Sequence, residues 1–374
     1  VQDHIDGLAD APAKGPLGEK ASRLVDLLSV SISEQPLVGG TKQILDILRQ
    51  AVDASLNTAG PGYRAYIPGG GIYGAALADF ASNCFNRYTG LAAAAPALAR
   101  LESDVLQWLA AEFGYGVQAR GILTSGGSLA NFTALVTARV SHFREDDDLR
   151  LATAYTSSQA HHSVTKSARM AGLPSHNMRV VPVDERMRLR TDSLSALVEA
   201  DSAAGLRPFC VVASAGTTNT GAIDPLHDVA DVCAAHELWM HVDGAYGGAF
   251  VLCDDGRTRL DGIQRADSIT FDPHKGLFLP YGTGCLLVRD GARFHDPLSL
   301  VAEGTKTDFQ VEVNSYLYGT RFMTWLAATY SPDHVVRWVA RQDDSKAYFA
   351  ARFEQVFEKP LKEAWTDWIA WERE

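Results

Sequence analysis

The chain has 374 residues, of which 46% are hydrophobic and 21% are charged, so it is long enough to fold into one large domain and a smaller one. Its formal net charge of -11 argues against nucleic acid or an anionic membrane as a partner, and no apolar run is long enough to cross a bilayer. We expect a cytoplasmic protein, because the five cysteines are scattered without a CxxC pair and the first residues do not resemble a signal peptide.

The first part of the chain is predicted to be helical. Apolar residues recur on one face of the segment 41–56, and a Gly/Pro-rich loop over residues 59–74 separates this segment from two further helices at 76–84 and 96–113. We therefore treat residues 1–60 as an N-terminal helical segment.

A different pattern begins at residue 121. Short apolar runs alternate with helical stretches, and in chain order the runs read GILTS, LATAYTS, MRVVPV, PFCVVAS, LWMHVD, SITFD and GCLLVR. Strands that alternate with helices predict an α/β fold in which a mostly parallel central sheet is flanked by helices. Near residue 295 the composition changes to helical, tryptophan-rich sequence, so we place a large domain at 61–295 and a mainly helical segment at 296–374.

Lys275 lies in the segment SITFDPHKG, directly after an apolar run. Pro273 ends regular strand pairing there, and Gly276 leaves room for the backbone beside a ligand. A lysine at the end of a buried strand fits an amine that condenses with the aldehyde of pyridoxal 5′-phosphate (PLP). The alternative from this segment alone is a solvated loop lysine.

Asp243 ends another apolar run, in the segment LWMHVDGAYGG. A carboxylate at this place suits the protonated pyridine nitrogen of PLP, and the small Ala245 leaves space for a flat ring. One alternative is that Asp243 caps a helix. Another is a metal site made by the pairs His241 with Asp243 and Asp272 with His274, but no HExxH or Cys/His cluster supports it, so we expect no metal.

Three further segments carry groups that suit a phosphorylated ring cofactor. Gly126, Gly127 and Ser128 lie between a strand and a helix, where backbone N–H groups bind phosphate. His161 opens the helix after LATAYTS, where its ring could stack on the cofactor or simply cap the helix. Thr218 follows the strand in VVASAGTTNTG, where its hydroxyl could reach the ring hydroxyl or the phosphate.

The run GGGIYG at residues 69–74 fits the spacing GxGxxG. No strand precedes it, so it does not indicate a dinucleotide site. We interpret it as a loop that lines a substrate pocket together with Tyr63, Tyr66, Ile67 and Pro68.

In chain order these motifs resemble those of the group II PLP-dependent decarboxylases, the aromatic-L-amino-acid decarboxylase family of fold type I. The similar stretches lie between about residues 60 and 293 and include YRAYIPGGG, LESDVLQWLAAEFGYG, TSGGSLAN, QAHHSV, GTTNTGAIDP, HVDGAYGG and DPHKGLFLPYGTGCLLVRDGA. The separation of 32 residues between Asp243 and Lys275 is the most specific part of the resemblance.

The resemblance implies roles for single residues. Lys275 corresponds to the lysine that forms the internal aldimine with PLP, and Asp243 corresponds to the partner of the pyridine nitrogen. His161 corresponds to a ring-stacking histidine that also handles protons. The other residues expected to contact the cofactor are Gly126, Gly127, Ser128, Thr218, Ala245, Asp272 and His274. Asp272 stands where some relatives have asparagine.

The implied reaction removes the α-carboxylate of an L-amino acid, aromatic or related, as CO2 and leaves the amine. The amino acid is the expected small-molecule partner. The resemblance also implies a homodimer with the active site at the subunit interface, across which residues 1–60 pack. Two alternatives stay open: a PLP-dependent oxidative deaminase that forms an aldehyde or another lyase, and a truncated PLP-binding protein without catalysis.

The resemblance ends after about Phe294. Relatives continue there with a mobile loop whose tyrosine protonates the carbanion, and then with a small α/β domain. In this chain Tyr316, Tyr318 and Arg321 stand at a comparable distance within a different motif. We therefore expect an atypical C-terminal segment, with cofactor binding retained and decarboxylation reduced. Three short helices are predicted after Ser331, where Ser-Pro-Asp is typical of a helix start.

Overall fold

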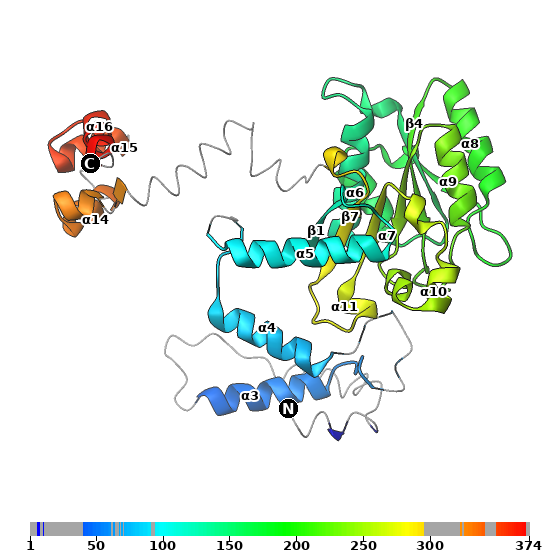
Figure 1. The fold of residues 1–374 in the computed structure, drawn as a ribbon, viewed down its shortest axis with the longest axis horizontal. Coiled ribbons are helices and arrows are strands. Elements are labelled where there is room, and N and C mark those ends of the chain that lie inside the picture. The colour runs from blue at the N-terminus through cyan, green and yellow to red at the C-terminus, as the bar shows by residue number, and fades with distance from the viewer. Residues whose placement is uncertain are drawn as a thin grey trace. The chain divides into compact units, whose positions relative to one another are not determined.

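The computed structural model describes residues 40–60, 71–90, 94–294, 325–340 and 349–371, together with positions 6, 7, 10, 63, 67, 69, 322 and 323. The chain forms two compact units, Val1–Asp296 and Pro297–Glu374, and each is described by itself (Figure 1). Five residues singled out above lie outside the described residues: Tyr66, Pro68, Tyr316, Tyr318 and Arg321. In the described stretches, no helix is both long and apolar enough to cross a membrane.

The first unit is built on a seven-stranded sheet with the order β1-β7-β6-β5-β4-β2-β3. Neighbouring strands from β6 to β3 are parallel, and among the described strands β7 alone runs in the direction opposite to the others. The predicted α/β fold with a mostly parallel sheet is thereby confirmed. The strands are β1 (Arg120–Thr124), β2 (Ala152–Ser157), β3 (Met178–Val181), β4 (Arg207–Ser214), β5 (Trp239–Asp243), β6 (Ser268–Phe271) and β7 (Gly284–Val288).

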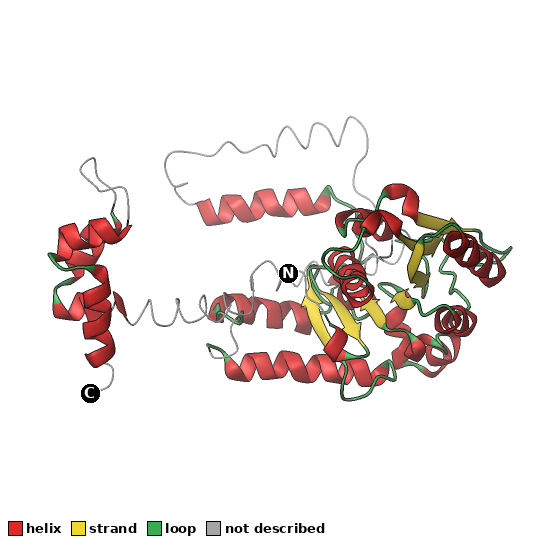
Figure 2. Ribbon diagram, turned by 90° about the horizontal axis from the view of Figure 1, so that it is seen from above, coloured by secondary structure: helices red, strands yellow, loops and turns green. Residues whose placement is uncertain are grey.

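Helices cover both faces of this sheet (Figures 1 and 2). On β4, Val211 and Ala213 pack in one hydrophobic cluster, whereas Cys210 and Val212 pack in the other, as the two-residue period of a strand requires. The first cluster includes residues of α5 (Pro96–Glu112), α8 (Thr191–Ala203) and α9 (Leu226–Ala235). The second includes residues of α6 (Gly127–His142) and α7 (His162–Met170). The unit also contains α3 (Gly40–Asp53), α4 (Tyr73–Phe85), α10 (Asp254–Arg259) and α11 (Pro273–Gly276).

The carboxyl ends of the parallel strands meet at one edge of the sheet. Because β1, β2, β4, β5 and β6 run in the same direction, the loops that follow them start from this edge. These loops lead into α6 after β1, α7 after β2 and α11 after β6. In sheets of this kind, ligands bind outside the carboxyl ends of the strands.

The second unit contains the helices α14 (Pro332–Val339), α15 (Phe349–Phe357) and α16 (Leu361–Trp371). As predicted, α14 begins after Ser331, whose hydroxyl oxygen accepts a hydrogen bond from the His334 N–H at 3.4 Å. The core of this unit is largely aromatic, and its buried aromatic residues are Phe322, Trp325, Trp338, Phe353, Phe357 and Trp368.

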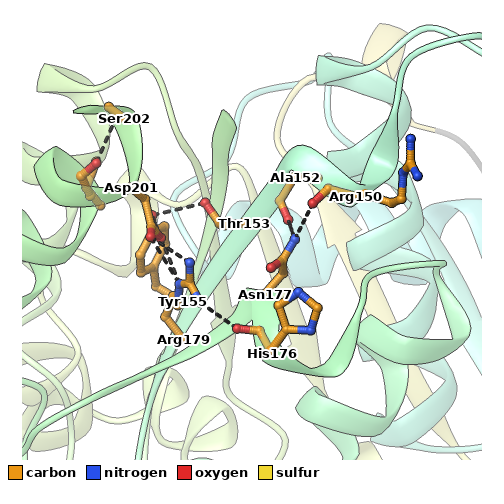
Figure 3. A network of polar contacts seen from close by, with 10 residues as sticks. Arg150, Ala152, Thr153, Tyr155, His176, Asn177, Arg179, Asp201 and Ser202 are labelled. Carbon is orange, nitrogen blue, oxygen red and sulfur yellow. Dashed lines mark hydrogen bonds and ion pairs between the residues drawn. The ribbon is translucent and has the colours of Figure 1, made fainter. Parts of the chain in front are cut away.

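The first unit also contains buried polar groups that lie away from this sheet edge, and these groups are hydrogen-bonded to one another or to the backbone. The hydroxyl of Tyr155 donates to Asp201 at 2.8 Å, and Arg179 donates to the same carboxylate at 2.7 Å (Figure 3). Close by, the Nδ2 atom of Asn177 donates to two backbone carbonyls at 2.7 and 2.9 Å (Figure 3). These contacts hold β3 and α8 against β2 without leaving the polar groups unpaired.

Asp224 is a buried carboxylate that joins the end of β4 to the segment before α8. It accepts hydrogen bonds from the N–H groups of Leu189 and Ser214, each at 2.7 Å. Burial raises the pKa of Asp224 to about 6, and the two hydrogen bonds oppose this shift. A carboxyl with a raised pKa binds its proton more tightly in the folded state than in the unfolded state. Its ionisation therefore lowers the stability as the pH rises from about 4 to about 6.

Replacing Asp224 with Asn should remove this pH dependence. When the pH falls from about 7 to about 5, the unfolding free energy of the unmodified chain should rise by about 1 kcal/mol relative to Asp224→Asn. Denaturant unfolding of both proteins at the two pH values measures this difference. If the difference between the two proteins does not change with pH, the Asp224 carboxyl does not titrate in this range.

Candidate active site

A cavity of about 290 Å³ opens at the edge formed by the strand ends. The structure brings all ten residues predicted for the site to the lining of this cavity. They are Gly126, Gly127, Ser128, His161, Thr218, Asp243, Ala245, Asp272, His274 and Lys275. The lining also includes Asn131, Ser163 and Tyr246, which carry no signal of their own in the sequence.

Lys275 lies on α11, the short helix that follows β6. Its Nζ atom is 3.0 Å from Oδ2 of Asp272, and a quarter of the side chain is exposed. Two glycines permit close packing here. A Cβ on Gly276 would come within 2.2 Å of the Ala249 Cβ, and a Cβ on Gly69 would come within 2.4 Å of the Lys275 carbonyl oxygen. The Gly-rich loop predicted to line a substrate pocket therefore touches the backbone of this lysine.

Asp272 is a buried carboxylate between Lys275 and the turn that begins α6. Its Oδ2 atom pairs with Lys275, whereas Oδ1 has no hydrogen-bond partner among the described residues. Burial raises the pKa of Asp272, and Lys275 and His274 oppose that shift. The unpaired oxygen is therefore a buried acceptor in the wall of the cavity.

The turn after β1 has the geometry of an anion site. Gly126 has a φ angle of 151°, which favours glycine, and a Cβ on Gly127 would come within 2.9 Å of Oδ2 of Asp272. The first N–H groups of a helix have no partner within the helix, so those of Gly127 and Ser128 are directed out of the end of α6.

His274 lies at the same end of the cavity. Its Nδ1 atom donates to the carbonyl oxygen of Thr283 at 2.5 Å, which leaves Nε2 as the other ring nitrogen, 3.8 Å from Oδ2 of Asp272. The helix N–H groups and the Ser128 hydroxyl form a donor set that fits the phosphate of PLP, and the glycine turn leaves space for the group.

Asp243 is the last residue of β5 and is 8% exposed. Its Oδ2 atom accepts a hydrogen bond from Asn131 Nδ2 at 2.9 Å, and its Oδ1 atom accepts one from the Ala245 N–H at 3.1 Å. Through the second contact, Asp243 caps the turn that follows β5. The same residue also lines the cavity. Two N–H donors hold the carboxylate in place beside the small Ala245, which suits a flat ring with a basic nitrogen.

His161 caps a helix and also lines the cavity. It caps α7, because Nδ1 accepts from the Ser163 N–H at 3.3 Å, and its half-buried ring lines the cavity. Burial lowers the pKa of His161, and His162 and Lys275 act in the same direction, against the opposing effect of Asp243. The neutral imidazole is therefore favoured.

His241, considered above as a metal ligand, lies behind the cavity wall. Its ring is fully buried, with Nε2 at 3.0 Å from Asn131 Oδ1 and Nδ1 at 2.8 Å from Ser268 Oγ. Burial lowers the pKa of His241 to about 4, so the ring is neutral near pH 7. Within the described residues, no group of three or more His, Cys, Asp or Glu side chains is arranged to hold a metal ion.

The similar sequences named here belong to decarboxylases. The conserved domain of pyridoxal-dependent decarboxylases matches residues 23–315. An aromatic-L-amino-acid decarboxylase of Bacillus atrophaeus is 33% identical over 320 residues, which cover 84% of this chain and 65% of that protein. The cysteine sulfinic acid decarboxylase of Homo sapiens is 35% identical over 277 residues, which cover 73% of this chain and 55% of that protein.

Solved structures have the same fold. The crystal structure of Oryza sativa TDC with PLP and tryptamine aligns with a TM-score of 0.72 and 29% identity, over 78% of this chain and 62% of the rice chain. The chain thus spans less than two thirds of the length of these relatives. Since the matched domain covers most of the chain, we conclude that this protein belongs to the pyridoxal-dependent decarboxylase family, whose cofactor is PLP.

Proposed function

We propose that this protein is a PLP-dependent decarboxylase that converts an L-amino acid, aromatic or related, into the amine and CO2. The observation that carries the proposal is one cavity that combines Lys275, Asp243 and the N-terminus of α6. The relatives named above are decarboxylases of aromatic L-amino acids and of cysteine sulfinic acid, which supports loss of an α-carboxylate as the shared reaction.

When bound, PLP supplies an electron-poor ring that accepts the electron pair of the breaking bond between Cα and the carboxylate. We assign Lys275 as the amine that binds the cofactor aldehyde covalently. Asp243 is assigned to the ring nitrogen, whose protonated form a nearby carboxylate stabilises. Gly127 and Ser128, with the glycine turn before them, are assigned to the phosphate.

Asp272 and His161 are the groups placed to move protons. A lysine must lose a proton before its amine can react, and Asp272 Oδ2 lies 3.0 Å from the Lys275 Nζ atom. The raised pKa of Asp272 makes this carboxylate a better proton acceptor than an exposed aspartate. His161 has a lowered pKa and accepts hydrogen bonds at Nδ1, so its Nε2 atom carries the proton that the neutral ring can donate.

The substitution Lys275→Ala tests the covalent assignment. The PLP-loaded chain should show visible cofactor absorbance, and borohydride should fix the cofactor to the peptide that contains Lys275. Lys275→Ala should show neither signal, and its rate of CO2 release should fall at least ~1000-fold. The exposed Lys166 on α7 is the matched control, and Lys166→Ala should behave like the unmodified chain. Trapped cofactor on another lysine would contradict the assignment.

A panel of L-amino acids tests the reaction itself. CO2 and amine in equal amounts support a decarboxylase. The turnover rate then shows whether decarboxylation is slow, as the atypical C-terminal segment predicts. Aldehyde with peroxide would instead identify an oxidative deaminase. Bound PLP without any turnover would identify a non-catalytic PLP-binding protein.

We further propose that the protein is a homodimer. α4 contains no buried residue, and Phe80 and Phe85 on this helix are each 68% exposed. Exposed apolar side chains also occur on α3 and α5. They are Ile44, Leu45, Leu48, Val52, Leu98, Leu101, Val105 and Trp108. Apolar exposure of this extent is typical of a surface covered by another subunit, and the family resemblance implies that the subunit is a second copy.

The substitution Phe80→Arg tests the dimer. A charged side chain at a buried apolar contact should raise the dissociation constant of the dimer by at least about tenfold. Met170 on α7 is also exposed, at 61%, so Met170→Arg adds the same charge away from these helices and should leave the dimer intact. Sedimentation velocity over a concentration series measures both. An unmodified chain that stays monomeric throughout the series would contradict the proposal.

A further inference from the structure

Asn131 is a buried polar residue of the site that the roles assigned above do not use. It lies near the start of α6 and is 1% exposed. Its Nδ2 atom donates to Asp243 Oδ2 at 2.9 Å and to Ser163 Oγ at 3.1 Å. Its Oδ1 atom is 3.0 Å from His241 Nε2. Both hydrogens and the oxygen of this amide are therefore hydrogen-bonded to buried partners.

The hydrogen bonds on its two sides agree on the orientation of this amide. Its NH2 group donates to Asp243 Oδ2 on the cavity side, so its Oδ1 atom faces His241. Because an amide oxygen only accepts, the neutral His241 ring carries its proton on Nε2 and donates it to Asn131 Oδ1. His241 Nδ1 is then an acceptor, 2.8 Å from the Oγ atom of Ser268, which itself accepts from Trp239 Nε1 at 2.8 Å.

A second branch leads from the same amide to His161. Ser163 Oγ accepts one hydrogen from Asn131, so its own hydrogen is left for His161 Nδ1, at 2.8 Å. The N–H of Ser163 also points to Nδ1, at 3.3 Å. With Nδ1 as the acceptor, the neutral His161 ring keeps its proton on Nε2. The Asn131 amide is therefore linked directly to Asp243 and, through Ser163, to His161.

We propose that Asn131 is a positioning residue that holds Asp243 and His161 together in the geometry that PLP requires, through one amide oriented by His241. The inference rests on the proposed function, because it is a ring cofactor that needs a carboxylate at its nitrogen and an imidazole on its face at the same time. Asn131 acts through Asp243 and Ser163. The rival explanation is that a buried Asn at this position only stabilises the packing of α6.

Asn177 offers a matched control for this test. It is also buried, at 2% exposure, and its Nδ2 atom likewise donates two hydrogen bonds, to backbone carbonyls outside the cavity (Figure 3). Asn131→Leu and Asn177→Leu each replace the amide with an apolar side chain of similar size. Asn131→Leu loses three buried hydrogen bonds and Asn177→Leu loses two, and both should lose stability in denaturant unfolding.

The PLP-loaded full chain gives the readout that separates the two explanations. In Asn131→Leu, Asp243 loses one of its two donors, so the PLP dissociation constant should rise about tenfold or more. The pH midpoint of the visible cofactor absorbance should also move, by about one unit. In Asn177→Leu the PLP dissociation constant should stay within about twofold of that of the unmodified chain, and the pH midpoint of the cofactor absorbance should not move.

Equal dissociation constants and equal midpoints in the two variants would show that Asn131 only packs, and the inference would be wrong. If Asn131→Leu does not fold, Asn131→Ser, with a smaller polar side chain, is judged by the same two outcomes. Failure of the proposed function is seen separately, because in that case the unmodified chain itself shows no borohydride-trapped cofactor on Lys275.

Discussion

The parallel pairing of β5 with β6 is the constraint on which the geometry of the site depends. Asp243 pairs with Thr270, so the two strands reach the same edge of the sheet in register. Asp272 and Lys275 follow directly after β6 and therefore lie on the same cavity as Asp243. Parallel neighbours need a long connection, and the short helices at Gly247–Leu252 and Asp254–Arg259 occupy it. The spacing of 32 residues between Asp243 and Lys275 is thus a consequence of the topology.

The alternation of side chains along β5 decides what lies behind the cofactor pocket. Met240 and Val242 belong to the hydrophobic cluster on one face, and Trp239 belongs to the cluster on the other. His241 and Asp243 share the face of Trp239 because a strand has a period of two. Polar groups on a buried face cost stability unless they are hydrogen-bonded, and here each is paired with α6 or β6. The two-residue period of β5 therefore places apolar side chains in the core on one face and hydrogen-bonded polar side chains around Asp243 on the other.

The strands and the cavity could be predicted because both leave a local signal in the sequence. Each apolar run forms a strand close to its predicted bounds, and the predicted site residues follow strand ends, where parallel sheets collect chemistry. The family match, at residues 23–315, is wider at both ends than the resemblance seen in the motifs. The start of α14 follows from the capping pattern at Ser331, which is also local.

The contacts that Asn131, Ser163 and Gly69 make could not be predicted in this way, because they depend on tertiary packing. A polar residue in a helix such as α6 gives the same pattern whether it faces water or a neighbouring strand, and only packing of α6 on β5 makes Asn131 a partner of Asp243. Gly69 lies in a loop far from Lys275 in sequence, and its contact with the lysine backbone appears only in the folded chain. For the same reason His241 could be read as a metal ligand until its buried partners were known.

The two sides of the cavity differ in their access to water, and the difference fits the proposed chemistry. Asp243 is 8% exposed and packs against other buried groups, so its charge lies in a region of low effective dielectric constant. In the proposed function, this charge would stabilise a positive ring nitrogen more strongly than it would in water. Lys275 and His161 are more exposed, so protons can reach and leave them. The proposed function needs a fixed charge and groups that exchange protons in the same cavity, and the strand ends supply both.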